Sequence, residues 1–136
     1  MPKSHFYIAD NISAQTDGKV AIIGLYPDRQ LVYHPPEEFK RLAAKGERVA
    51  LTANLSMLLV VSDLPAGTYQ VTAILATPTE EMRPDFQSME FEVIQGKSNN
   101  LIFNLQPLQI KEPGEYALKI KAGAYEFEGA FSILFE

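Results

Sequence analysis

The sequence predicts an all-β fold, an antiparallel Greek-key β-sandwich with eight or nine short strands and one inserted helix near residues 36–45. Apolar and polar residues alternate through most of the chain, as in strands with one buried face. Gly, Pro, Asn and Asp separate these segments at short intervals, which is typical of immunoglobulin-like sandwiches. With 136 residues, of which 46% are hydrophobic, the chain suits one domain over residues 1–136.

The first elements are a hairpin and a short strand. Residues 5–14 and 19–26 are extended in character, and Asp17-Gly18 between them is a strong turn signal. Residues 30–34 suit an edge strand, because the two prolines that follow end it.

One segment has helical spacing instead. Residues 36–45 place Phe39, Leu42 and Ala43 at i, i+3 and i+4, with acids first and bases last. Pro36 near the start and Gly46 just past the end are the usual helix boundaries. We expect a short helix that caps an edge or an end of the sandwich.

The middle of the chain returns to strands. Residues 49–61 put every second side chain, from Val49 to Val61, on one side. The remaining alternating segments before the last hairpin are 68–76, 88–93 and 101–106.

The final hairpin is the most sharply specified element. Segments 116–122 and 125–135 flank Gly123, which suits the first position of a two-residue type II′ turn. This register places Lys121 opposite Glu126 on one face, and such a pair contributes a few tenths of a kcal/mol. The opposite face is apolar, so we expect one wet and one buried side.

Two strands share an entry pattern of Pro, Gly and then Tyr. The tyrosines are Tyr69 and Tyr116. A tyrosine in this position buries its ring and returns its hydroxyl to nearby backbone, as in the tyrosine corner of Greek-key sandwiches. We interpret both as structural residues rather than ligand-stacking ones.

The order of these motifs resembles a family of small uncharacterised bacterial β-sandwich proteins. The matching motifs are Y-I-A-D from Tyr7, D-G-K-V-A-I-I-G-L-Y from Asp17, and P-G-E-Y from Pro113. The helical stretch 35–47 departs from the family, in which this region is extended or a short loop. The resemblance implies a fold and a bacterial or phage origin, and it transfers no catalytic residue.

Composition narrows the classes of function. A formal net charge of −5 disfavours nucleic acid, because phosphate binding needs clustered Lys and Arg. The absence of Cys removes disulfides, thiolate nucleophiles and Cys-based zinc sites. The first residues lack the apolar run of a signal peptide, and the longest aliphatic run is too short for a membrane span. We therefore expect a cytoplasmic protein with no membrane or nucleic-acid partner, unless the chain is exported by a route that needs no N-terminal signal.

Residues for chemistry are scarce, so we expect no catalytic, cofactor-binding or metal-binding residues. His5 and His34 lack ligand spacing, and no phosphate-loop, dinucleotide or serine-hydrolase motif is present. Glu90 and Glu92 share a strand face, which we interpret as solvated rather than as a carboxylate pair for glycoside chemistry. Calcium held by loop aspartates remains an alternative, with the candidates Asp10, Asp17, Asp63 and Asp85.

Surplus apolar residues are the unusual feature. Residues 20–25 are apolar on both faces, and residues 57–61 lose their alternation. The candidate interaction surface consists of Ile23, Leu25, Leu58 and Val60. The preferred prediction is that the helix covers these strands, with Phe39 and Leu42 in the core; a second copy or a protein partner is the alternative cover.

Three classes of function remain open. The favoured class is a non-catalytic protein-interaction or assembly module, acting with a protein partner or as a homo-oligomer. The alternative is a small-ligand or carbohydrate-binding sandwich, for which Tyr26, Tyr33 and Phe86 are the candidate platform residues. An enzyme is the least supported, because no nucleophile, base or metal set is evident.

Overall fold

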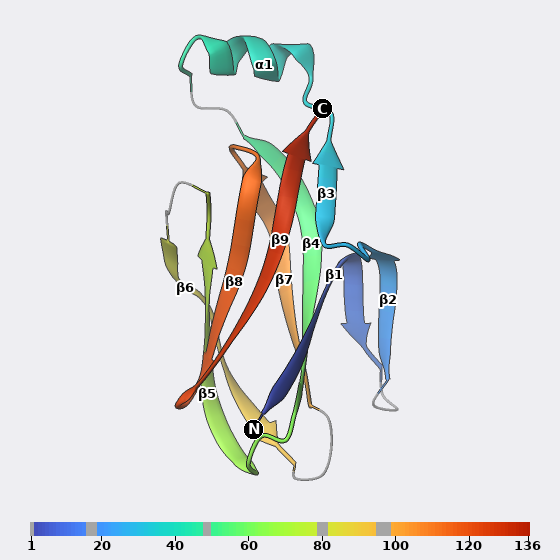
Figure 1. Ribbon diagram of the computed structural model, residues 1–136, viewed down its shortest axis with the longest axis vertical. Helices are drawn as coiled ribbons and strands as arrows, with labels where there is room; N and C mark the ends of the chain where they lie inside the picture. The colour runs from blue at the N-terminus through green and yellow to red at the C-terminus, as the bar shows by residue number, and fades with distance from the viewer. Residues whose placement is uncertain (1, 16–18, 48–49, 79–81, 95–98) are drawn as a thin grey trace.

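The chain forms two packed β-sheets and one short helix, which confirms the predicted all-β sandwich (Figure 1). The computed structural model describes residues 2–15, 19–47, 50–78, 82–94 and 99–136, without the side chains of 82–88, 106 and 107. Its elements are β1 (Lys3–Ala14), β2 (Val20–Leu25), β3 (Gln30–Tyr33), α1 (Glu37–Ala44), β4 (Leu51–Ser62), β5 (Gly67–Ala76), β6 (Met82–Val93), β7 (Asn99–Ile110), β8 (Gly114–Ala122) and β9 (Tyr125–Phe135).

The strands divide unevenly between the sheets. One sheet has the order β2-β1-β4-β7, and the other has the order β3-β9-β8-β5-β6. The prediction of a wholly antiparallel arrangement is wrong at one edge, where β3 runs parallel to β9. The chain leaves β2, turns through residues 26–29 and enters the other sheet already running in the direction of β9, so the pairing needs no hairpin (Figure 1).

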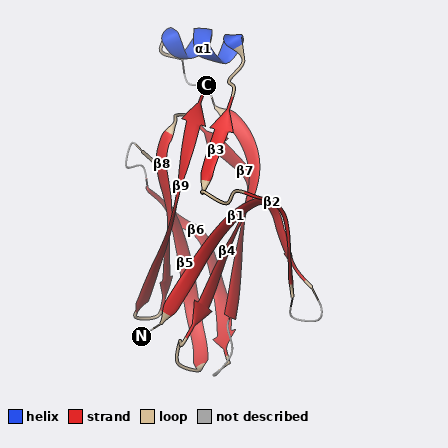
Figure 2. Cartoon of the chain, turned by 45° about the vertical axis from the view of Figure 1, so that its right-hand side comes forward, coloured by secondary structure: helices blue, strands red, loops and turns tan. Residues whose placement is uncertain are grey.

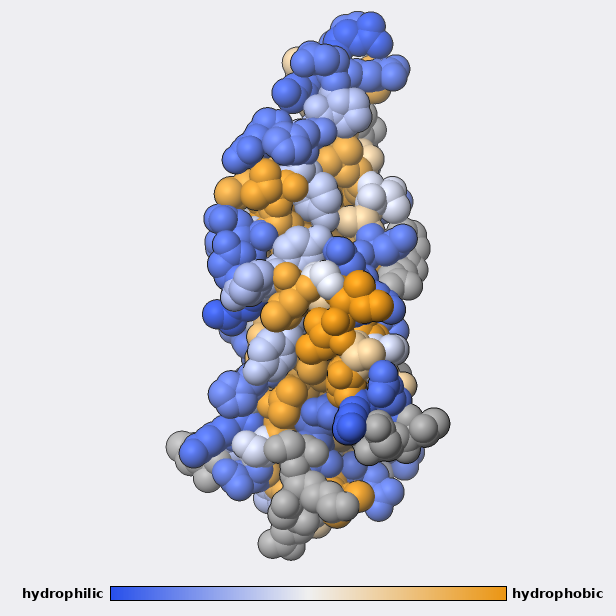
Figure 3. Space-filling model, turned by 90° about the vertical axis from the view of Figure 1, so that its right-hand side faces the viewer, coloured by the Kyte–Doolittle hydropathy of each residue, from blue (hydrophilic) through white to orange (hydrophobic). Residues whose placement is uncertain are grey.

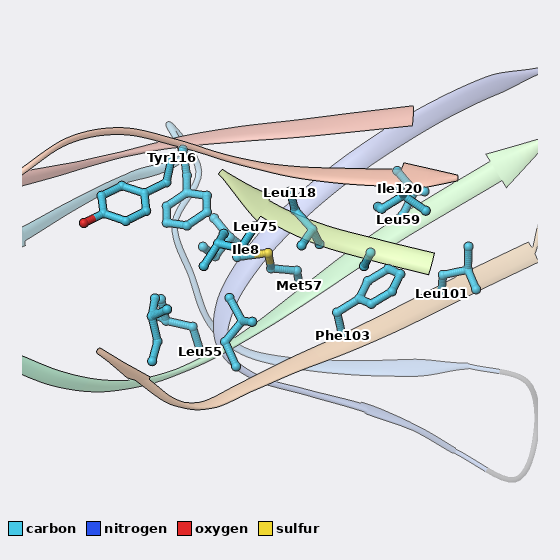
Figure 4. Close-up of a cluster of buried hydrophobic side chains, with 14 of the residues drawn as sticks. Ile8, Leu55, Met57, Leu59, Leu75, Leu101, Phe103, Tyr116, Leu118 and Ile120 are labelled. Atoms are coloured by element: carbon cyan, nitrogen blue, oxygen red, sulfur yellow. The ribbon is translucent and has the colours of Figure 1, made fainter. Parts of the chain in front are cut away.

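The core lies between the two sheets, where the predicted alternation holds. Met57, Leu59 and Val61 of β4 are fully buried, and Phe103 and Leu118 meet them from β7 and β8 (Figure 4). Fully burying one such side chain stabilises the fold by about 1.5–3 kcal/mol relative to its exposed state.

The final hairpin forms as predicted. Lys121 pairs with Glu126 across β8 and β9, with 3.5 Å between Nζ and Oε1. Gly123 has φ 59°, whereas Ala124 does not have a positive φ, which is the pattern of a type II′ turn. On the buried face, Gly129 leaves room for the Phe6 ring of the opposite sheet, which occupies the space that a Cβ would need.

Both predicted tyrosine corners are confirmed. The Tyr69 hydroxyl donates to the Pro65 carbonyl over 2.6 Å, and the Tyr116 hydroxyl donates to the Glu112 carbonyl over 2.7 Å. Tyr116 is buried and its ring stacks on Phe131. These contacts explain the repeated Pro, Gly, Tyr pattern as a structural feature.

The helix forms where it is predicted, but its predicted covering role is wrong. Its acidic first turn holds Glu38, which pairs with Arg41, and no residue of α1 is fully buried. Phe39 is half-buried against Phe135, with ring centroids 5.8 Å apart, and Leu42 is also half-buried. Figures 1 and 2 show α1 lying across one end of the sandwich, away from the middle of β4. Two turns of helix at that end cannot reach Leu58.

Candidate interaction surface

The four residues predicted as an interaction surface differ in how exposed their side chains are. Ile23 is 64% exposed and Leu25 is 45% exposed, whereas Leu58 is only 4% exposed and Val60 is half-buried. Leu58 is therefore excluded from any surface, which corrects the prediction. Ile22, which was not among the four, is 39% exposed. The exposed candidates all lie on β2.

The β1–β2 hairpin itself covers the outer side of β4. Ala9, Ile12 and Leu58 form a second buried cluster, outside the main core. Half-buried side chains from β2, β4 and β7 pack against this cluster; they are Val20, Val60 and Ile102. The part of the hairpin that holds Ile12 and Val20 therefore covers the outer side of β4, which α1 was predicted to cover.

A contact between the two strands shapes this hairpin. The Tyr26 N–H donates to the Ile8 carbonyl over 2.9 Å, and the Tyr26 hydroxyl donates to Asp10 Oδ1 over 2.6 Å. Gly24 has φ 71°, and the Asp10 carboxylate occupies the place that a Cβ would take. Only glycine combines that φ with that space. The Ala-Asp and Gly-Leu-Tyr motifs are therefore explained by this contact.

Electrostatics at this contact keep two phenols protonated. Burial raises the pKa of Tyr26 far above its ordinary value, and the hydrogen bond to Asp10 and the charge of Asp10 add to the shift. Burial also raises the pKa of Tyr33, with a further contribution from the Asp10 charge. Neither phenol is a base at neutral pH.

The outer side of β2 is an uncharged sheet edge. In the sheet order β2 is terminal, and no described strand pairs with its outer edge. Residues 20–25 read V-A-I-I-G-L, without a charge or a proline. Figure 3 shows apolar side chains, in orange, gathered in the middle of the face on which β2 and β3 lie.

A shallow groove of about 370 Å³ lies where the chain leaves β2. Its walls come from β1 and from the turn after β2; the lining residues are Ser4, His5, Phe6, Tyr7, Leu25, Tyr26, Pro27 and Arg29. Arg29 is held at φ 54° between hydrogen bonds from its N–H to the Tyr26 carbonyl and from the Ser132 N–H to its carbonyl.

The predicted aromatic platform is not assembled as expected. Tyr26 and Tyr33 are half-buried and pack against the main core, so only part of each ring faces solvent. The side chain of Phe86 lies outside the described residues. Tyr7, which is 38% exposed and lies opposite Leu58 in the observed register, was missed, and no local pattern in the sequence points to it.

The described chain does not bring the candidate metal ligands together. Within the described ranges, no group of three or more His, Cys, Asp or Glu residues is close enough to hold an ion. Asp10 accepts the Tyr26 hydroxyl, and Asp17 and the Asp85 side chain lie outside the described residues. Glu90 and Glu92 are exposed beside the buried Val93, as predicted.

No described helix has the length and apolar character needed to cross a membrane.

No protein-family profile matches the chain, and no curated protein matches it. Among solved structures, a β-glucosidase from Listeria innocua in complex with glucose is similar over 98% of this chain, with 10% identity and a TM-score of 0.42. A β-glucosidase from Erythrobacter marinus is similar over 62% of this chain, with 15% identity and a TM-score of 0.41. The chain spans about 16% and 13% of those proteins, respectively. Likenesses this distant do not bear on activity.

Proposed function

We propose that this chain is a non-catalytic protein-interaction or assembly module, of bacterial or phage origin, whose binding surface is the outer edge of β2. The observation that carries the proposal is the exposure of Ile22, Ile23 and Leu25 together on one uncharged edge strand. The same chain covers its other doubly apolar strand, β4, with its own hairpin. Apolar side chains gathered on one exposed strand are typical of a contact surface.

Photo-cross-linking tests this function directly. A photoreactive residue is placed at Leu25, with a matched probe at the exposed Glu92 on β6 of the other sheet. In an extract of the cells that make the chain, we expect a protein adduct from position 25 and none from position 92. Adding Ile23→Lys should abolish the adduct, because it places a charge on the contact surface. Equal labelling from both positions would contradict the proposal.

Binding of a small ligand or carbohydrate is the second candidate. The groove beside Tyr7, with His5 and Arg29 among its lining residues, supports it, because an aromatic wall with polar neighbours suits a sugar. Titration with mono- and disaccharides, followed by NMR, tests it. Chemical-shift changes centred on Tyr7, and lost in Tyr7→Ala, would favour this function over the interaction module.

A further inference from the structure

We propose that a second copy of this chain docks on β2 by antiparallel strand addition, so that β2 pairs with β2 and two four-stranded sheets join into one. This inference rests on the proposed function and names its partner. Its first support is the direction of the backbone groups along the free edge of the strand.

The register shows which groups point outward. The Gln15 N–H donates to the Lys19 carbonyl over 2.8 Å, and the pairing continues in step to Ala21 and Ile23. Bonded and non-bonded pairs alternate in an antiparallel ladder. Ala21 and Ile23 therefore turn their N–H and C=O groups toward β1, whereas Val20 and Ile22 turn theirs toward the free edge.

The edge lacks three of the features that commonly protect one. Exposed edge strands are usually blunted by Lys, Pro or an inward-pointing charge, and residues 20–25 contain none of these. Figure 1 shows β2 as the outermost strand on its side of the molecule, with no labelled element beyond it. Among the elements that the structure describes, none therefore blocks the approach of an incoming strand.

Side chains alone do not supply the interface. A stable protein contact buries about 800 Å² on each partner, which is much more than three partly exposed side chains offer. Strand addition gains affinity from main-chain hydrogen bonds, and uses side chains for selectivity. The small apolar area of β2 thus favours strand pairing over docking of two faces.

The incoming strand has to match β2 on both faces. Ile22 shares a face with Ile12, and Ile23 lies on the opposite face beside Asn11. The partner is therefore an extended, uncharged segment with apolar side chains on both faces. Within this chain β2 itself has that character, and a two-fold antiparallel pair closes without leaving a further free edge at the contact.

A pair of substitutions separates backbone docking from side-chain docking. Ile22→Ala and Ile22→Pro both remove the side chain, but only Pro also removes the outward N–H, and Pro is tolerated on an edge strand. In sedimentation equilibrium we expect a concentration-dependent dimer of the unmodified chain. Each dimer loses two donors in Ile22→Pro, so it should dissociate about ten- to a hundredfold more readily than Ile22→Ala. Circular dichroism checks that both variants fold.

Amide exchange of the unmodified chain gives a second measurement that does not depend on a variant folding. Above the dimer midpoint, the N–H groups of Val20 and Ile22 should gain protection. Those of Ala21 and Ile23 should be protected at every concentration. Equal effects of Ile22→Ala and Ile22→Pro, without this concentration-dependent protection, would overturn strand addition.

A chain that stays monomeric at all concentrations would overturn the second copy as the partner. If the probe at Leu25 then still captures a different protein, the proposed function stands and only this inference fails. If it captures nothing, the proposed function fails as well.

Discussion

At the residue scale, a few local contacts determine how the β1–β2 hairpin is held. Asp10 of β1 fills the space beside Gly24 of β2 and accepts a hydrogen bond from the hydroxyl of Tyr26, which directly follows β2, so these three residues depend on one another. The tyrosine corners act similarly at the entries to β5 and β8. Each contact joins a side chain to backbone or to a neighbouring strand, and so directs the path of the chain.

Gly24→Ala should destabilise the protein more than a matched glycine substitution. Gly24 and Gly46 both have positive φ, at 71° and 78°, and a Cβ at Gly46 would meet nothing within 4 Å. Gly46→Ala should therefore cost only the conformational penalty of about 1–2 kcal/mol. Gly24→Ala adds a clash with Asp10, and urea unfolding should show a clearly larger loss. Equal losses would show that Asp10 moves aside freely.

Tyr26 should contribute a pH-dependent part of stability. Its pKa is raised on folding, so its contribution is complete below the unfolded pKa of about 10 and is lost as the pH rises above that value. Urea unfolding between pH 8 and pH 11 should show a steeper alkaline loss for the unmodified protein than for Tyr26→Phe. Parallel curves would mean that the phenol ionises equally well in both states.

At the element scale, two peripheral elements cover different parts of the sandwich. The hairpin lies over the outer side of β4 and contributes the buried Ile12, whereas α1 caps one end and contributes no fully buried residue. Loss of contacts from the hairpin should therefore affect stability more than loss of contacts from the helix. The half-buried Phe39 is accordingly expected to matter less than a core aromatic.

Ile12→Ala and Ile23→Ala form a matched pair on the same hairpin. Ile12 is 2% exposed and Ile23 is 64% exposed. Ile12→Ala should cost about 2–4 kcal/mol in urea unfolding, because it opens a cavity under Leu58. Ile23→Ala should stay within about 0.5 kcal/mol when measured on the monomer. A small effect of Ile12→Ala would show that the hairpin is not held by this cluster.

At the scale of the whole molecule, two strands are apolar on both faces, and the chain itself covers only β4 on both sides. The hairpin covers the outer side of β4. This arrangement places β2 at the edge of the sheet, where three of its apolar side chains are exposed. The molecule therefore stabilises its core with a strand that is itself incompletely covered. In the dimer that we propose, a second copy at that edge completes the same sheet.

Salt should strengthen the proposed dimer that forms through β2. Each chain carries a net charge of −5, so two copies repel one another at low ionic strength. The contact strand is uncharged, and screening from about 0.05 to 0.5 M salt weakens only the repulsion. Sedimentation equilibrium should show a tighter dimer at high salt, while Ile23→Lys stays monomeric at both concentrations. Weaker association at high salt would point to ion pairs in the interface instead.

Local patterns in the sequence were enough to predict the individual elements and their buried faces. The alternation in β4 predicted that Met57 and Leu59 point inward, and the charge pattern predicted the pairing of Lys121 with Glu126. The turn residues predicted both tyrosine corners and the final hairpin. These features follow from residues close together in the chain, or from the two-residue period of a strand, so they are readable without the fold.

The way in which distant segments meet could not be predicted, because it depends on long-range packing. Ile12 covers Leu58 because β1 pairs with β4 through one half and with β2 through the other, and no local pattern specifies that division. The parallel pairing of β3 with β9 likewise joins residues 30–33 to residues 132–135, which are far apart in the chain. An apolar pattern on both faces indicates that a strand needs to be covered on both sides. Which segment covers it depends on long-range packing. For that reason Leu58 is buried, whereas Ile23 remains exposed.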